Sequence, residues 1–191
     1  MKNWTNWLFG AAALVALGTS AALLAPARDA SAQTMQLKRA PLATELVGGP
    51  WLGTPGGRPI TLASQRGKVV VLHFWTFACS NCLANIPAYN RIDRNFPKSQ
   101  VQVISVHTPE FAFEHVPKNV ERRVKALNIH YPVLLDAKEV NWGRWNQQFW
   151  PTIYIIDKEG RVHFKHEGEF GSDEAGFTRD IETLVKEPAP H

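Results

Sequence analysis

The sequence predicts an α/β domain with a mixed central sheet, and three observations lead to this prediction. Two nearly continuous apolar runs, Val69 to Trp75 and Val101 to Val106, have the character of strands that are covered on both faces. A helical stretch from Leu83 to Phe96 lies between them, so the three segments form a parallel strand-helix-strand crossover. Near the C-terminus, the turn Lys158-Glu159-Gly160 joins two further strands into an antiparallel hairpin.

The remaining predicted elements follow one another through short connections. In chain order they are a helix at 117–127, a strand at 133–136, a helix at 139–149, strands at 152–157 and 161–166, and an amphipathic helix at 173–186. Before the first long strand, Gly48-Gly49-Pro50 and Pro55-Gly56-Gly57 are typical of turns and predict a short hairpin around Trp51 and residues 59–62. We therefore expect a sheet flanked by helices, with an N-terminal hairpin and a central insertion.

The N-terminal segment has the pattern of an export signal. Lys2 precedes an apolar stretch over residues 7–25, and Ala30-Ser31-Ala32 matches the small-residue pattern of a cleavage site. The stretch is also long enough to span a bilayer, so a cleaved signal peptide and a membrane anchor both stay open. In either case we expect the rest of the chain to be extracytoplasmic, in the periplasm or anchored facing it. The expected divisions are a signal peptide or anchor at 1–32, a linker at 33–50, one domain at 51–187 and a tail at 188–191.

The net charge of the chain is a mild excess and gives only weak evidence about any partner. The formal net charge of +4 falls to +3 without residues 1–32, because that segment carries two cations and one acid. The basic cluster Arg122, Arg123 and Lys125 lies with Glu121 on a helical segment that lacks interleaved aromatic residues. We therefore interpret it as a solvated helix face and expect no nucleic acid binding.

Cys79-Ser80-Asn81-Cys82 lies between the first long strand and the following helix, and it contains the only two cysteines of the chain. A two-residue spacing constrains little of the unfolded chain, so a stabilising cross-link explains the pair poorly. Structural zinc would need a second pair of ligands at matching spacing, which the sequence lacks. Redox chemistry explains the pair better, because two thiols at a helix N-terminus can close into a small disulfide and open again.

We assign different roles to the two sulfurs. Cys79 begins the helix, where backbone N–H groups and the helix dipole favour a thiolate, so we expect it to be exposed and to attack the substrate. Cys82 lies one turn further and is expected to resolve the mixed disulfide. Ser80 and Asn81 are uncharged, so this loop does not tell a reductant from an oxidant.

Three segments together resemble the TlpA/DipZ-like branch of the thioredoxin superfamily. They are residues 67–76 leading into Cys79-Ser80-Asn81-Cys82, the sequence Val-His-Thr-Pro-Glu-Phe-Ala-Phe-Glu at 106–114, and Trp150-Pro151-Thr152. The resemblance covers roughly residues 51–169 and implies a thioredoxin-like fold. It also implies an extracytoplasmic thiol–disulfide oxidoreductase without a bound cofactor, which acts reductively on disulfides of exported proteins and is resupplied by a membrane electron donor. Related proteins keep cysteines reduced for cytochrome c assembly.

The same resemblance implies that Pro151 is a cis proline that faces the dithiol and leaves the backbone of Trp150 free to pair with a substrate strand. A proline removes a hydrogen-bond donor from a strand, and a trans proline at the start of an edge strand is the alternative interpretation. Trp75 and Thr152 are expected to line the substrate site together with Trp150. The aromatic residues Trp142, Trp145, Phe149 and Trp150 are expected to pack in the core and at its rim, with the alternative that some of them frame an apolar substrate groove.

Three further side chains are proton-transfer candidates. His73 occupies the position at which thioredoxins carry a buried acid, and we expect it either to accept the proton of Cys82 or to be a hydrogen-bonded core histidine. Glu110 and Glu114 follow the second long strand, and we favour Glu110 as a catalytic residue over the alternative of a solvated loop.

The rival hypothesis is a non-enzymatic Cu(I) carrier. Two thiolates with His73 or His107 would suit this soft ion. A set made of His107, Glu110, Glu114 and His115 fits no named metal motif, and we expect no metal there.

Overall fold

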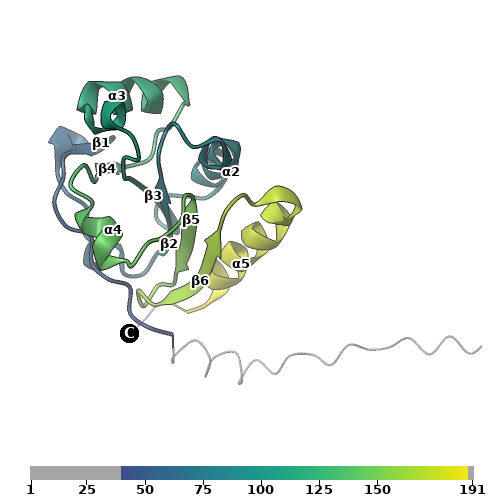
Figure 1. Cartoon of the computed structure of the whole chain (residues 1–191). Coiled ribbons are helices and arrows are strands. Elements are labelled where there is room, and N and C mark those ends of the chain that lie inside the picture. The colour runs from purple at the N-terminus through teal and green to yellow at the C-terminus, as the bar shows by residue number, and fades with distance from the viewer. Residues whose placement is uncertain (1–39, 189–191) are drawn as a thin grey trace, which may run out of the picture.

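The computed structural model describes residues 40–188, which form one α/β domain around a six-stranded sheet. Figure 1 shows the arrangement, and the strand order is β1-β4-β3-β2-β5-β6. The strands are β1 (Trp51–Leu52), β2 (Val69–Trp75), β3 (Val101–His107), β4 (Val133–Leu135), β5 (Thr152–Ile156) and β6 (Val162–Glu167). The helices are α2 (Ser80–Asn95), α3 (Pro117–Ala126), α4 (Val140–Arg144) and α5 (Glu174–Lys186). Short 3-10 turns are η1 (Pro55–Gly57), η2 (Ala63–Gln65), η3 (Ala112–His115) and η4 (Gly171–Asp173).

The centre of the sheet is the parallel pair of β2 and β3, with α2 as the crossover between them. Every residue of β2 is buried, as its continuous apolar sequence predicts. On the other side β2 pairs antiparallel with β5, which continues into β6 through the hairpin at Lys158-Glu159-Gly160. The predicted crossover and the predicted C-terminal hairpin are therefore both confirmed.

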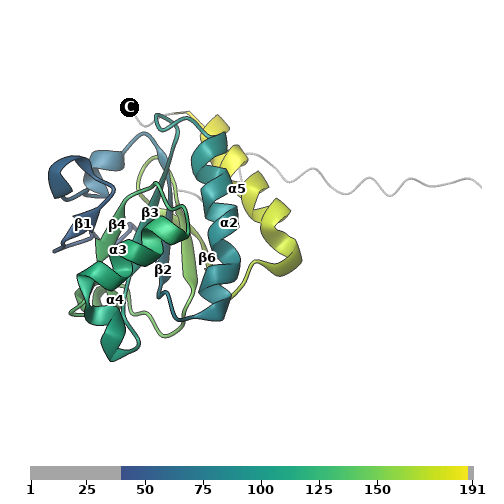
Figure 2. The same cartoon turned by 90° about the horizontal axis from the view of Figure 1, so that it is seen from above.

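Two apolar clusters cover the two faces of the sheet. Alternate residues of β2 and β3, among them Val71 and Val103, pack under α2, α3 and α5. The residues between them, among them Leu72 and Ile104, pack under α4 and the segment before β2. Figure 2 shows α2 and α5 together on one side of the strands, and Figure 1 shows α4 on the other side. This alternation follows from the period of two along a strand.

Two predicted elements are wrong. The N-terminal hairpin does not form, because Trp51 and Leu52 pair antiparallel with β4 instead of with residues 59–62. The predicted helix at 139–149 shrinks to α4, since Glu139 and Asn146 have φ angles of 56° and 49° and so leave the helical region at both ends. The hairpin is therefore lost to pairing with a distant strand, and the helix is shortened by two residues in the left-handed conformation.

The last part of the predicted linker lies on the domain. Leu42 forms an antiparallel bridge with Arg161 next to β6, and Leu46 is buried in the core. The side-chain amide of Asn141 binds both backbone groups of Val47, accepting from its N–H at 2.9 Å and donating to its carbonyl at 2.8 Å. Residues 40–50 are therefore part of the folded unit, in contrast to the expected tether.

The predicted signal peptide or anchor at 1–32 and the first residues of the linker lie outside the described residues. Across residues 40–188, none of the helices combines the length and the apolar character that crossing a membrane would need.

Candidate active site

Cys79 and Cys82 lie at the start of α2 with both sulfurs free. Cys79 is the N-cap residue, and its Sγ accepts a hydrogen bond of 3.2 Å from the backbone N–H of Cys82. This contact places the first sulfur at the positive end of the helix, where an anion is stabilised. Cys79 is half-buried, whereas Cys82 is only 1% exposed. The two sulfurs therefore differ in solvent exposure as the sequence predicts, and of the two only Cys79 is accessible to a substrate disulfide.

The environment of Cys82 holds this residue in its protonated form. Burial raises the pKa of the Cys82 thiol, the neighbouring Cys79 sulfur raises it further, and the charge of Glu110 adds to the rise. A thiol in that state does not compete with Cys79 for substrate. It becomes a nucleophile only after Cys79 has entered a mixed disulfide, which is the sequence of events that a resolving cysteine needs.

The carboxylate of Glu114 ties together the two loops next to the dithiol. One of its oxygens, Oε1, accepts hydrogen bonds from the hydroxyl of Thr76 and, at 2.8 Å, from the backbone N–H of Ala78. The other, Oε2, accepts from the backbone N–H groups of Glu110 at 2.9 Å and Phe111 at 3.0 Å. Since Ala78 immediately precedes Cys79, this side chain fixes the backbone that leads into the active-site helix.

Hydrogen bonding also sets the charge of Glu114. Burial by itself would raise the pKa of this carboxyl, but the hydrogen bonds from Thr76, Glu110, Phe111 and Ala78 outweigh burial and lower the pKa. The group is therefore a carboxylate at neutral pH and cannot donate a proton there. The sequence favours Glu110 over Glu114 as a catalytic residue. In the structure Glu110 is exposed, whereas Glu114 is 1% exposed and accepts hydrogen bonds from four donors.

The sequence does not single out Thr76 as a functional residue, and it indicates Glu114 only as a proton-transfer candidate, not as the side chain that joins the two loops. Thr76 is a polar residue directly after an apolar strand, and Glu114 follows four residues after Glu110. Thr76 could have been recognised as a candidate because it is a polar residue between an apolar strand and the cysteine motif. For Glu114 the sequence holds no sign that its four donors come from two separate loops.

His73 lies deep in the core. Its ring is fully buried and stacks on Tyr89 with 4.0 Å between centroids, and Tyr131 approaches its edge at 5.7 Å. Neither ring nitrogen has a hydrogen-bond partner among the described residues. Burial lowers the pKa of His73 to about 3. A base this weak is poorly matched to a thiol of raised pKa, so the environment does not support His73 as proton acceptor, and it is not the hydrogen-bonded core histidine of the alternative interpretation either.

The histidines also do not complete a copper site. His107 is buried and lies against Phe77 and Trp75, and burial lowers its pKa to about 4. Within residues 40–188 no three His, Cys, Asp or Glu side chains come close enough together to hold a metal ion. Neither His73 nor His107 therefore joins the two sulfurs as a third ligand, and this structure gives the Cu(I) carrier no support.

The loop before β5 lies at the same edge of the sheet as the dithiol loop. Phe74 of β2 pairs with Thr152, so residues 149–151 leave the sheet at the same edge as the loop that carries Cys79. The Trp150–Pro151 bond is cis. Trp150 is half-buried and stacks on Trp142, with ring centroids 4.0 Å apart.

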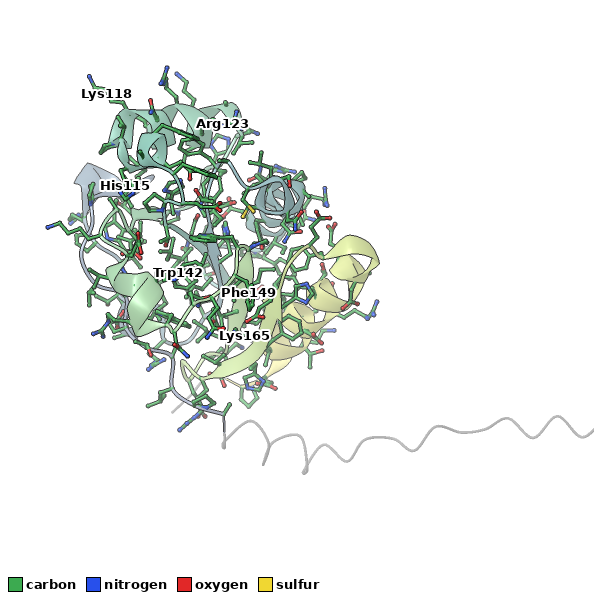
Figure 3. All side chains as sticks on the ribbon, viewed as in Figure 1. His115, Lys118, Arg123, Trp142, Phe149 and Lys165 are labelled. Carbon is green, nitrogen blue, oxygen red and sulfur yellow. The ribbon has the colours of Figure 1, made fainter. Side chains whose placement is uncertain are left out.

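Two residues that are expected to contact the substrate are buried and cannot do so. Trp75 and Thr152 are both 0% exposed, because they belong to central strands that are covered on both faces. The Thr152 hydroxyl donates instead to the carbonyl of Phe149 at 2.8 Å and shapes the loop from within. Phe149 itself is 54% exposed, which agrees better with the alternative of an apolar substrate groove than with packing in the core. Figure 3 shows Phe149 and Trp142 near one another on the viewed side.

Comparison with known proteins agrees with this geometry. The model of the AhpC/TSA family matches residues 38–165. The chain belongs to this family. Protein DipZ of Mycobacterium tuberculosis (strain CDC 1551 / Oshkosh) is 40% identical over 167 residues, which is 87% of this chain and 23% of DipZ. The thiol-disulfide oxidoreductase ResA of Geobacillus thermodenitrificans (strain NG80-2) is 30% identical over 107 residues, covering 56% of this chain and 58% of ResA.

The solved structures show the same fold. The crystal structure of the thioredoxin-like superfamily protein SPOA0173 aligns with a TM-score of 0.68 at 25% identity, over 78% of this chain and 99% of that protein. The predicted thioredoxin-like fold and the TlpA/DipZ-like resemblance are therefore confirmed. The domain therefore belongs to the AhpC/TSA family and has a thioredoxin-like fold, and its relative ResA is named a thiol-disulfide oxidoreductase. The chain spans less than a quarter of the length of the DipZ proteins that it matches.

Proposed function

We propose that this protein is an extracytoplasmic reductase of disulfides in exported proteins, and that Cys79 and Cys82 carry its reaction. The observation that supports the proposal most strongly is the asymmetry of the two sulfurs. Cys79 is accessible at the N-terminus of α2, while Cys82 is buried one turn further with a raised pKa. An attacking thiolate and a protected resolving thiol are the two groups that disulfide exchange requires.

In the proposed reaction, the thiolate of Cys79 attacks one sulfur of a substrate disulfide. The substrate S–S bond breaks, a mixed disulfide with Cys79 forms, and the leaving sulfur takes up a proton. Cys82 then loses its proton and attacks the Cys79 sulfur, which releases the second substrate thiol and leaves a Cys79–Cys82 disulfide. Two electrons pass from the protein to the substrate in each cycle, so a dithiol or other two-electron donor must reduce the protein again.

The sequence and the family resemblance support the proposed direction, compartment and substrate class. The N-terminal segment has the pattern of an export signal, and the resemblance to the TlpA/DipZ-like branch implies reduction outside the cytoplasm with electrons from a membrane donor. Cysteines of cytochrome c precursors are one substrate class within this proposal. Among the comparisons, ResA is named a thiol-disulfide oxidoreductase.

The reduction potential of the Cys79–Cys82 couple tests the direction. A reductase is expected to lie near thioredoxin, at about −270 mV, and far from a strong oxidant at about −120 mV. Fractionation of the producing cells tests the compartment, because an exported protein is recovered outside the cytoplasmic fraction. A potential close to that of the strong oxidant would contradict the reductive proposal while leaving the exchange chemistry intact.

A further inference from the structure

We propose that Phe111, Phe113 and the cationic side of α3 form a docking surface for an acidic segment next to the target cysteine of a disulfide-bearing protein. We call Phe111 and Phe113 the aromatic ridge, and Lys118, Arg122 and Arg123 the cationic side of α3. The inference rests on the proposed disulfide exchange and adds a preference for one class of substrate. On this proposal, the charge of the substrate residues next to the target cysteine determines how fast Cys79 reacts with the substrate.

The aromatic ridge is apolar surface without cover in the described part of the chain. Phe111 is 47% exposed and Phe113 is 51% exposed, and their rings lie parallel with centroids 5.7 Å apart. Val116 extends this surface and is 46% exposed. Large apolar side chains gathered at one exposed place mark interaction sites more often than scattered ones do.

The aromatic ridge contacts the loop that leads into Cys79. The ring of Phe113 contacts that of Phe77, with centroids 5.7 Å apart, and Phe77 lies two residues before Cys79. The carboxylate of Glu114 accepts hydrogen bonds both from the N–H of Phe111 and from the N–H of Ala78. A polypeptide whose disulfide meets Cys79 therefore has the ridge within reach of its neighbouring residues.

The cationic side of α3 continues from the ridge. The carbonyl of Phe113 accepts a hydrogen bond of 2.8 Å from Asn119, whose side-chain oxygen accepts one from Arg122. The guanidinium of half-buried Arg123 lies 6.0 Å from the ring centroid of Phe77, and its Nε is buried without a partner among the described residues. None of the ion pairs within residues 40–188 uses Lys118, Arg122 or Arg123.

These cations suit carboxylates in a docked segment. Figure 3 shows Lys118 and Arg123 on α3, across the viewed side from Trp142 and Phe149. The dithiol loop is thus joined to aromatic side chains at η3 and, through them, to cationic side chains on α3. Charges at the edge of an interface act mainly on the rate of association and on the choice of partner.

A polypeptide fits this surface better than a membrane does, although aromatic and basic side chains also suit anionic lipid headgroups. The ridge and Cys79 are held to the same loop by Glu114 and Phe77. A lipid layer on the ridge would cover the half-buried sulfur that must meet a protein disulfide. An acidic segment beside the substrate cysteine occupies the ridge and leaves the sulfur in contact with its target.

Two synthetic peptides test the proposal. Each contains one disulfide and one phenylalanine, and they differ only in carrying glutamates or lysines beside the cysteines. The reduced protein is expected to reduce the acidic peptide about tenfold faster than the basic peptide at low ionic strength. The difference is expected to shrink as salt is added, because both partners are exposed. Uncharged hydroxyethyl disulfide, measured with the same protein, tests the exchange chemistry by itself.

The double variant Lys118→Glu/Arg122→Glu is expected to reverse the preference. A gain in rate with the basic peptide cannot come from damage to the fold, so this outcome identifies the charge as the cause. Arg94→Glu is a control for charge reversal away from this surface, since Arg94 is exposed in the last turn of α2 at the opposite end from the dithiol. The control is expected to keep the preference of the unaltered protein.

Equal rates for the two peptides, or an unchanged preference in the double variant, would overturn the docking surface. Binding of the protein to vesicles of anionic phospholipid with loss of peptide reduction would overturn it in favour of a membrane-facing surface. Failure to reduce hydroxyethyl disulfide would instead overturn the proposed function, so the two failures are distinguishable.

Discussion

The carboxylate of Glu114 accepts a hydrogen bond of 2.8 Å from the backbone N–H of Ala78, the residue immediately before Cys79. Through its second oxygen the same carboxylate holds the loop at Glu110 and Phe111. A single buried charge thus connects the start of the active-site helix with the segment that follows β3. The position of the nucleophile depends on a side chain that lies 35 residues further along the chain.

Glu114→Gln is expected to lower the free energy of unfolding by about 1–3 kcal/mol at neutral pH, because an amide cannot serve four donors as a carboxylate does. The pKa of Glu114 is lower in the folded protein than the ordinary value of 4.5. Its stabilising contribution is therefore complete above that value and is lost as the pH falls through the folded pKa. Denaturant unfolding at several pH values measures this, and the difference between the two proteins is expected to shrink on acidification. A difference that grows below pH 4.5 would contradict the carboxylate assignment.

Glu110→Gln is expected to change the free energy of unfolding by less than about 0.5 kcal/mol, as is usual for an exposed residue. The charge of Glu110 raises the pKa of Cys82, so its removal makes Cys82 easier to deprotonate and speeds the resolving step. Single-turnover decay of the mixed disulfide measures that step. If Glu110 relayed the proton of Cys82, the variant would resolve the mixed disulfide more slowly.

His73→Phe is expected to leave the rate of exchange and its pH profile between about pH 5 and 8 unchanged, because His73 is already neutral in this range. The phenyl ring keeps the stacking on Tyr89 and removes two ring nitrogens that have no partner among the described residues. Stability is therefore expected to stay equal or to increase. A fall in rate together with a shifted pH profile would restore His73 as a proton acceptor.

Iodoacetamide is expected to label Cys79 and not Cys82 in the reduced protein near neutral pH. Cys79 is partly accessible at the start of α2, while Cys82 is 1% exposed and burial raises its pKa. Peptide mapping by mass spectrometry after brief labelling distinguishes the two. Predominant modification of Cys82 would reverse the roles of the two thiols.

The parts of the fold that the sequence predicts well are those set by neighbouring residues. The apolar run of β2 has its strand character regardless of what covers it, and the crossover through α2 follows from chain connectivity. The predicted N-terminal hairpin fails because Trp51 finds its partner in Leu134, far along the chain. A turn-rich sequence does not show which strand edge is free to pair with it.

In the site, too, the residues whose roles depend on local sequence are predicted, and those whose roles depend on distant contacts are not. The roles of Cys79 and Cys82 follow from their spacing and their place at a helix start, which are local features. The choice between Glu110 and Glu114 was not predictable, because it depends on which carboxylate the two loops enclose. Trp75 was expected in the substrate site, yet it is buried, since the sequence alone does not tell how far the covered part of β2 extends.

The central claim is that Cys79 attacks and Cys82 releases, and trapping of mixed disulfides tests it most directly. Cys82→Ser leaves the accessible thiol and removes the resolving one, so complexes with substrate proteins are expected to accumulate. In Cys79→Ser the remaining thiol is 1% exposed, and burial raises its pKa.

Both variants are produced in the cell that exports the protein, recovered under conditions that block free thiols, and separated on a non-reducing gel. The account predicts disulfide-linked complexes with Cys82→Ser and far fewer with Cys79→Ser, and reduction of the gel bands releases the substrates for identification. Equal trapping by the two variants, or more trapping by Cys79→Ser, would contradict the assignment of the nucleophile.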